Sequence, residues 1–376
     1  MTPAADRATP TTVVFDLGNV LLDWDPDRLY RKLIADPEER ARFLTEVVTP
    51  SWHNRQDRGR SVAEGTAELI AAHPEHAELI GAYYGRWDEM TAGALPATVD
   101  VVRELHDAGV RLVALTNWPR ETFEPARGRF PFFQCFDGIV VSGAENMAKP
   151  DPEIFALVLD RYDVDAATAV FVDDTPGHVN AARGVGMSGV VFTRADVLRR
   201  DLAALGLPVR ADVSIRAGVA ADLPALTEIY NHYVLTTAVT FDLDAFSVER
   251  RQEWFGRYRS TGPYRLLVAT RGDRVIGYAT SSPFRDKAAY APSIEVTAYL
   301  AADSGGAGVG SMLYQQLLHD LRGEDLHRAY AAIALPNEAS LALHRRFGFR
   351  DVGTMTEVGR KHGRWWDVLW MERDLP

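Results

Sequence analysis

Four positions in the first half of the chain carry side chains that could act on a phosphate group. A carboxylate can attack phosphorus and form an acyl phosphate. A hydroxyl, an amide and an ammonium group can hold phosphoryl oxygens, and paired carboxylates can bind magnesium, which prefers oxygen ligands. These positions are Asp16, the pair Thr116-Asn117, Lys149 and the pair Asp173-Asp174.

Each of these residues also has a simpler interpretation. An aspartate after a strand often caps a helix or forms a turn, an Asp-Asp pair is usually a solvated turn, and a lysine before a proline can lie on the surface. The order and spacing of all four positions favour one shared site over four unrelated features.

A glycine-rich run at 304–310 is the candidate site of the second half. It lies between an apolar run at 294–300 and a helix expected to begin near Ser311. Backbone N–H groups at such a strand-to-helix turn can hold a pyrophosphate. The alternatives are a flexible loop or a dinucleotide-binding turn, but nothing before the run has the pattern that starts a βαβ unit.

Alternating apolar runs and amphipathic stretches predict the elements that position the first site. They indicate a parallel sheet covered by helices on both faces, the Rossmann-like α/β class, with polar residues at the carboxyl ends of strands. Residues 27–92 have mostly helical spacing. The expected strands are 11–15, 110–115, 138–141, 169–172 and 189–192, and the expected helices are 99–108, 152–162 and 179–184.

The alternation breaks at 205–212, where we place a domain boundary. We expect a first domain at 11–205, a linker at 206–212 and a mixed α/β domain at 213–376. In the second domain, strands are expected at 213–216 and 294–300, a hairpin joins 266–269 to 275–279, and Asp222 is expected to cap a helix starting at Leu223.

Composition narrows the function classes. The net charge of −11 argues against a nucleic-acid or anionic-membrane partner, because both reward clustered Lys and Arg. No apolar run reaches the roughly 18 residues of a membrane span, and the first residues do not resemble a signal peptide. The single cysteine, Cys135, cannot form an intrachain disulfide and is expected to be buried and inert, which favours a cytoplasmic location.

Residues 11–205 resemble the haloacid dehalogenase superfamily, through the motif Phe-Asp-Leu-Gly-Asn-Val-Leu at 15–21 and the polar positions above. The resemblance implies a helical cap at about 24–95 and a magnesium-dependent phosphatase acting on a phosphorylated small metabolite. It makes Asp16 the nucleophile and assigns catalytic roles to Thr116, Asn117 and Lys149. The implied metal ligands are Asp16, the Gly18 carbonyl, Asp173 and Asp174.

Two residues depart from this pattern, and the first matters more. Most phosphatases of the superfamily have an Asp where this chain has Gly18, and that Asp protonates the leaving group. The first domain could therefore be slow, could need a good leaving group, could take an acid from the cap, or could only bind ligand. A dehalogenase is the other alternative, but its members usually lack the acidic pair, so we favour a phosphatase. His178 also replaces an Asn common in relatives.

Residues 213–375 resemble the GCN5-related N-acetyltransferases (GNAT), especially those acting on phosphinothricin and methionine sulfoximine. The resemblance rests on 229–231, 240–242, the glycine run, 337–349 and 357–367. It implies acetyl transfer from acetyl-CoA to a small amino-acid-like amine, and a homodimer. The first part of the chain would then make the whole protein bifunctional, or an acetyltransferase with an inactive binding domain. A binding module without any catalysis is the third and least favoured class.

The same resemblance assigns roles to individual residues. Glu295 would be the general base, although a salt bridge is its simpler interpretation. His344 stands where many relatives have a Tyr acid, although a lone helical His is often a surface or capping residue. Gly305 and Ala307 replace side chains common in relatives, but backbone amides do the main anchoring. The implied coenzyme A contacts are Val296, Tyr299, Gly305, Gly306, Gly308, Val309, Gly310, Asn337 and Ser340.

Overall fold

The computed structural model describes residues 9–375 and separates into two compact units, with the division between Arg210 and Ala211. Both units are α/β structures, so the predicted fold class is confirmed. Within the described residues, no helix is both long enough and apolar enough to span a bilayer.

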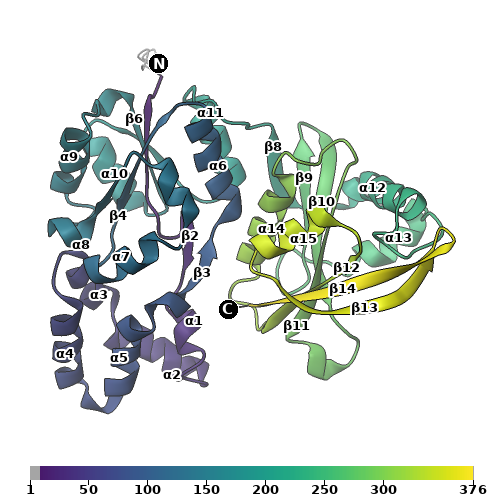
Figure 1. Ribbon diagram of the computed structural model, residues 1–376, viewed down its shortest axis with the longest axis horizontal. Helices are drawn as coiled ribbons and strands as arrows, with labels where there is room; N and C mark the ends of the chain where they lie inside the picture. Colours follow the sequence, from purple (N-terminus) through teal and green to yellow (C-terminus); the bar gives the residue numbers. More distant parts are fainter. Residues whose placement is uncertain (1–8, 376) are drawn as a thin grey trace. The chain divides into compact units, whose positions relative to one another are not determined.

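A five-stranded parallel sheet forms the centre of the first unit (Figure 1). Its strand order is β5-β4-β1-β6-β7. Because β1 lies between β4 and β6, the residues that follow these three strands meet at one edge of the sheet. The strands are β1 Thr12–Phe15, β4 Arg111–Thr116, β5 Gly138–Val141, β6 Ala169–Asp173 and β7 Ser188–Val191.

Helices cover both faces of this sheet because successive strand residues point to opposite sides. Val13 and Phe15 pack into one apolar cluster with residues of α6 and α11, whereas Val14 packs into another with residues of α9 and α10. Figure 1 shows these two helix pairs on opposite sides of the strands. The helices of this core are α6 Pro96–Asp107, α7 Arg120–Arg127, α8 Ser142–Glu145, α9 Pro152–Arg161, α10 Pro176–Gly184 and α11 Ala195–Ala204.

A helical segment is inserted between two short antiparallel strands, β2 Leu22–Trp24 and β3 Thr91–Ala94. Its interior is aromatic: Tyr30, Trp52 and Tyr83 are all buried there. The insertion lies where the resemblance placed a cap, and we call it the cap segment. Its helices are α1 Asp27–Tyr30, α2 Pro37–Arg42, a π-helical turn Phe43–Val47, α3 Pro50–Asp57, α4 Val62–Ala72 and α5 Ala77–Gly85.

The second unit is built on a seven-stranded sheet in the order β13-β14-β12-β11-β10-β9-β8. All its neighbouring strands are antiparallel except β11 and β12. The strands are β8 Val213–Ala217, β9 Leu266–Arg271, β10 Arg274–Pro283, β11 Ser293–Leu300, β12 Arg328–Ala334, β13 Arg350–Lys361 and β14 Arg364–Asp374.

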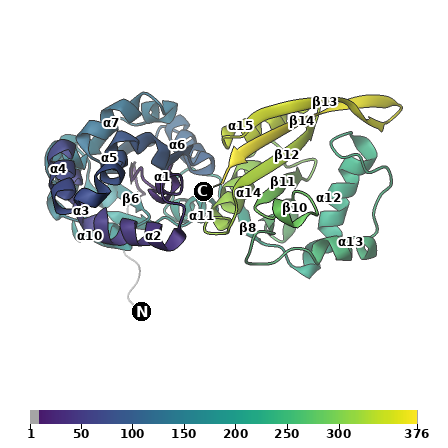
Figure 2. The ribbon, with the colours of Figure 1, turned by 90° about the horizontal axis from the view of Figure 1, so that it is seen from below.

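The parallel pair β11 and β12 opens into a wedge. These strands are paired only from Ser293 opposite Arg328 to Glu295 opposite Tyr330, although both continue further. Figure 2 shows α12 and α13 on one side of the sheet and α14 and α15 on the other. The helices are α12 Leu223–Thr236, α13 Val248–Phe255, α14 Val309–Asp320 and α15 Glu338–Arg346.

Several local predictions differ from the structure. Helices α6 and α10 each begin at a proline, three residues before the expected start. α14 starts at Val309, two residues before the expected Ser311, because the left-handed Gly308 already closes the loop. The Asp222 side chain does not cap α12; it accepts a hydrogen bond from the Val219 amide and forms an ion pair with Arg216. Cys135 is half-buried rather than fully buried, and burial raises the pKa of its thiol.

Candidate functional sites

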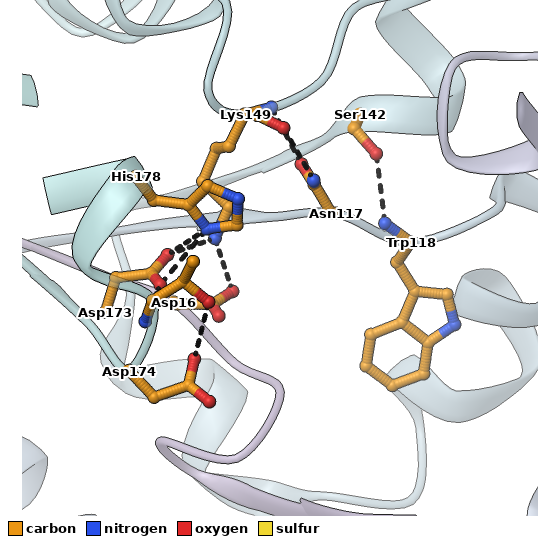
Figure 3. A network of polar contacts seen from close by, with 9 residues as sticks. Asp16, Asn117, Trp118, Ser142, Lys149, Asp173, Asp174 and His178 are labelled. Carbon is orange, nitrogen blue, oxygen red and sulfur yellow. Dashed lines mark hydrogen bonds and ion pairs between the residues drawn. The ribbon is translucent and has the colours of Figure 1, made fainter. Parts of the chain in front are cut away.

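Asp16, Lys149 and Asp173 form a buried ion-paired cluster beyond the carboxyl ends of β1 and β6 (Figure 3). The Lys149 Nζ atom lies 2.8 Å from Asp16 Oδ1 and 2.7 Å from Asp173 Oδ2. Two buried carboxylates repel each other strongly, and the ammonium group between them offsets that repulsion. The fold therefore places the predicted nucleophile against the lysine predicted to bind the phosphoryl group.

The two carboxylates of this cluster differ in how firmly they hold a negative charge. Burial raises the pKa of Asp16 to about 7, because Lys149 only partly offsets the loss of water and Asp173 adds repulsion. Burial also opposes ionisation of Asp173, but Lys149 and a hydrogen bond from His178 hold its pKa at about 2. For Lys149, burial acts in the opposite direction and lowers the pKa. The attraction of both carboxylates outweighs burial, so the pKa of Lys149 is raised overall.

A third carboxylate, that of Asp174, completes a candidate metal site. One oxygen each from Asp16, Asp173 and Asp174 lies within 4.8 Å of the other two. Burial and the neighbouring Asp173 charge raise the pKa of Asp174, so the three groups together favour a cation. An all-oxygen donor set of this spacing fits Mg²⁺. Gly18, whose carbonyl was the fourth predicted ligand, forms an isolated bridge with Leu22.

Asn117 holds the main chain of Lys149 in place. Its Nδ2 donates to the Lys149 carbonyl at 3.0 Å, and its Oδ1 accepts from the Lys149 amide at 2.9 Å. Both ends of the amide are thus used, which makes Asn117 a positioning residue.

The two other predicted residues near this site also lie close to its strands. Thr116 is buried at the last position of β4. His178, which stands where relatives often have Asn, places its Nδ1 atom 3.1 Å from both Asp173 oxygens.

In the second unit, a cavity of about 370 Å³ fills the wedge between β11 and β12. Its walls come from both strands, from the loop after β11 and from α15. Of the predicted coenzyme A contacts, Gly306, Gly308 and Val309 are not part of the wall. The predicted contacts that line it are Val296, Tyr299, Gly305, Gly310, Asn337 and Ser340, and His344 lines it as well.

The loop from β11 to α14 depends on two glycines in the left-handed region. Gly306 has φ +76° and Gly308 has φ +75°, conformations that other residues rarely adopt. Gly308 is the residue before the first turn of α14, where the backbone N–H groups have no partner within the helix. A helix N-terminus with free N–H groups attracts anions, so this end of the wedge suits a phosphate-bearing ligand.

Glu295 stands where β11 and β12 part. It is the last residue of β11 that pairs with β12, where it lies opposite Tyr330. Burial raises the pKa of its carboxyl group, and the Arg285 charge partly counteracts the rise. No ion pair within 4 Å is found for Glu295 in the described part of the chain, and Arg285, which the sequence analysis did not single out, acts on it through space.

His344 has both ring nitrogens engaged inside the protein. Its Nδ1 lies 2.7 Å from the Ser340 carbonyl oxygen, which can only accept, so Nδ1 carries the hydrogen. Its Nε2 lies 2.9 Å from the Tyr314 hydroxyl and therefore accepts from it. Burial lowers the pKa of His344, which favours this neutral form. The sequence gives no signal for the role of Tyr314, because its partner His344 lies on a different helix.

These two sites define a two-unit α/β enzyme, with one carboxylate–ammonium centre and one wedge for a phosphate-bearing ligand. Comparison with family models gives a haloacid dehalogenase-like hydrolase over residues 10–186 and an acetyltransferase (GNAT) domain over residues 215–370. The chain therefore belongs to the GNAT N-acetyltransferases through its second unit, and its first unit is similar to the haloacid dehalogenase-like hydrolases over residues 10–186.

Three curated relatives illustrate the similarity. A phosphinothricin N-acetyltransferase of Streptomyces coelicolor is 56% identical over 171 residues, which are 45% of this chain and 100% of that protein. An L-methionine sulfoximine/L-methionine sulfone acetyltransferase of Pseudomonas aeruginosa is 37% identical over 43% of this chain and 94% of that protein. The L-amino acid N-acyltransferase MnaT of Escherichia coli is 35% identical over the same shares of the two chains.

Proposed function

We propose that the chain is bifunctional. The second unit transfers an acetyl group from acetyl-CoA to a small amino-acid-like amine, and the first unit hydrolyses a phosphate ester with the help of Mg²⁺. The wedge between β11 and β12, with the N-terminus of α14 beside it, carries the first half of the proposal. The Asp16–Lys149–Asp173–Asp174 cluster carries the second half. A homodimer and a cytoplasmic location remain predictions of this proposal.

Acetyl transfer in the wedge needs a proton acceptor and a place for the leaving thiolate. The acceptor amine loses a proton to Glu295, its nitrogen attacks the thioester carbonyl, and the carbon–sulfur bond breaks to give the amide and the thiolate of coenzyme A. A carboxylate with a raised pKa is a stronger base than an exposed one, which suits Glu295 to this role. His344 is neutral, and its Nε2 atom accepts a hydrogen bond from the Tyr314 hydroxyl. A role for His344 in protonating the thiolate would therefore involve that hydroxyl as well.

Glu295→Gln is expected to lower kcat/KM for acetyl transfer by about 10²-fold, because general-base help is typically worth that much or more. In the wild type the rate should rise with pH as Glu295 loses its proton, at a pH above the usual range of a glutamate. The variant should lack this limb of the pH profile. Thiol release from acetyl-CoA measures both. Glu253→Gln, at a highly exposed glutamate, is the matched control and should behave as wild type.

The acceptor is proposed from the names of the relatives, which act on phosphinothricin, on methionine sulfoximine and sulfone, and on L-amino acids. All are α-amino acids or close analogues. A panel of these compounds, assayed for thiol release at fixed acetyl-CoA, tests the proposal. Absence of thiol release with every member would exclude this acceptor class.

Hydrolysis in the first unit would proceed through a phosphoaspartate. One Asp16 oxygen attacks phosphorus, the ester P–O bond breaks and the leaving oxygen takes a proton. Water then attacks phosphorus, releases phosphate and restores the Asp16 carboxylate. Lys149 faces Asp16 at 2.8 Å and can stabilise the charge on the transferred group. Bound Mg²⁺ would neutralise phosphoryl charge.

Two alternatives stay open for the first unit, a binding domain without turnover and a dehalogenase. The acidic cluster within 4.8 Å favours a metal-dependent phosphatase over a dehalogenase, whose chemistry needs no cation. A panel of phosphate esters with and without EDTA, run beside 2-haloacids, separates the three. Phosphate release that stops with EDTA supports the proposal, and halide release in EDTA contradicts it.

A further inference from the structure

Gly18 leaves the first site without an acid at the position two residues after Asp16. Departure of an alcohol from phosphorus needs a proton, because a free alkoxide is a poor leaving group. The structure brings another carboxyl group to this region from the cap segment. It belongs to Asp57, the last residue of α3.

Asp57 is buried and incompletely satisfied. It is 5% exposed, and its Oδ1 atom has no hydrogen-bond partner among residues 9–375. Its Oδ2 atom lies 3.6 Å from Nε2 of His53, beyond hydrogen-bond distance. A buried polar atom without a partner destabilises the folded state, so its presence calls for an explanation other than stability.

The end of α3 is fixed onto the loop that carries Lys149. Arg58 forms an ion pair with Asp151, two residues after Lys149. Gly59 lies so close to Asn146 that an added Cβ would stand 1.9 Å from the Asn146 Oδ1 atom. Helix α3 also packs against α8, which ends just before Asn146, as Figure 1 shows. These contacts bring Asp57 to the first site.

Two of the charged groups that act on Asp57 belong to the first site, and the third is the neighbouring Arg58. Burial raises the pKa of Asp57 to about 7, while Lys149 and Arg58 lower it and Asp16 raises it. His53 is neutral at that pH because burial lowers its pKa to about 4. The Tyr84 hydroxyl, which contacts His53 and Gln56, is neutral as well, since burial raises its pKa. Asp57 can therefore hold a proton near neutral pH, as an acid requires.

We propose that Asp57 is the general acid of the first site and supplies from the cap segment the carboxyl group that Gly18 lacks. This rests on the proposed phosphatase function. As Asp16 attacks phosphorus and the P–O bond breaks, the Asp57 proton passes to the departing oxygen, and an alcohol leaves. The Asp57 carboxylate can then take a proton from the water that attacks the phosphoaspartate, so the proton balance closes over one cycle.

The test compares leaving groups in Asp57→Asn. With an alkyl phosphate such as glycerol phosphate, kcat/KM should fall by about 10²–10⁴-fold, the usual worth of general acid catalysis. With p-nitrophenyl phosphate, whose leaving group departs without a proton, kcat/KM should change less than about tenfold. The value kcat/KM is used because it reports the steps up to ester cleavage.

A stability measurement separates this role from a structural one. Because Oδ1 makes no hydrogen bond, Asp57→Asn and Asp57→Leu should unfold in urea no earlier than wild type. Glu121→Gln is the matched control at the same junction, where Glu121 accepts a hydrogen bond from the Val62 amide. Glu121→Gln should change kcat/KM for the alkyl ester and for p-nitrophenyl phosphate by the same factor.

Each outcome of the leaving-group comparison either supports or overturns the assignment of Asp57. Equal loss on both substrates in Asp57→Asn, or no loss, overturns the assignment of Asp57 while the phosphatase proposal stands. Selective loss on the alkyl ester without loss of stability supports it. If the wild type releases no phosphate from either ester, the phosphatase proposal fails and this inference fails with it.

Gly59→Ala offers a second way to displace Asp57. The new Cβ would collide with Asn146, and φ of +93° is unfavourable for alanine. We expect unfolding at a lower urea concentration than in the wild type. We also expect a selective loss of kcat/KM on the alkyl ester that is smaller than the loss in Asp57→Asn. Asn146→Gly in the same chain removes the side chain in the way and should restore part of both. No recovery would contradict the close contact as the cause.

Discussion

Asp16→Asn is expected to reduce phosphate-ester hydrolysis by at least about 10³-fold, because an amide oxygen cannot replace the attacking carboxylate. The substitution keeps the size of the side chain, and Lys149 retains its ion pair with Asp173. The first unit should therefore stay folded. Acetyl transfer should remain at the wild-type rate, because Asp16 and Glu295 belong to separate units.

The measurement pairs two assays on one preparation, phosphate release from the ester panel and thiol release from acetyl-CoA. Asp16→Ala guards against slow conversion of Asn back to Asp. Mass spectrometry of acid-quenched wild type should find phosphate on the peptide that contains Asp16. Hydrolysis that persists in both variants would contradict the role of Asp16 as nucleophile.

The fold was largely predictable from the sequence because its elements depend on local periodicity. Val13 and Phe15 alternate with Val14, and this pattern alone places them on opposite faces of the sheet. The wedge could not be predicted from periodicity, because it arises where the pairing of β11 with β12 stops after Glu295. Such a change in pairing depends on residues far apart in sequence.

The site residues divide in the same way. Asp16 follows β1, Asp173 is the last residue of β6 and Asp174 follows it, so their proximity follows from the parallel sheet. The bonds of Asn117 to the Lys149 main chain depend instead on the path of a loop. Asp57 gave no signal of its own, since an aspartate at a helix end resembles any exposed one. Only its burial and its missing hydrogen bond distinguish it.

Lys149→Met is expected to destabilise the first unit by about 3–5 kcal/mol, the usual cost of removing one partner of a buried ion pair. The Nζ atom lies within 2.8 Å of carboxylate oxygens of both Asp16 and Asp173, and all three side chains are buried. Methionine has a similar shape but leaves two carboxylates facing each other. Lys32→Met is the matched control: Lys32 is 55% exposed and paired with Glu89, so its loss should cost less than about 1 kcal/mol.

Urea unfolding in EDTA, with hydrogen exchange of peptides from β1 and β6, reports the first unit separately from the second. A double-mutant cycle tests the cause. If repulsion between the carboxylates is responsible, adding Asp16→Asn to Lys149→Met should restore stability, because one of the two uncompensated charges is gone. Added Mg²⁺ should also raise the free energy of unfolding of Lys149→Met more than that of the wild type, because a cation would replace the missing positive charge. If the two substitutions simply add, the ammonium group is not what holds these carboxylates together.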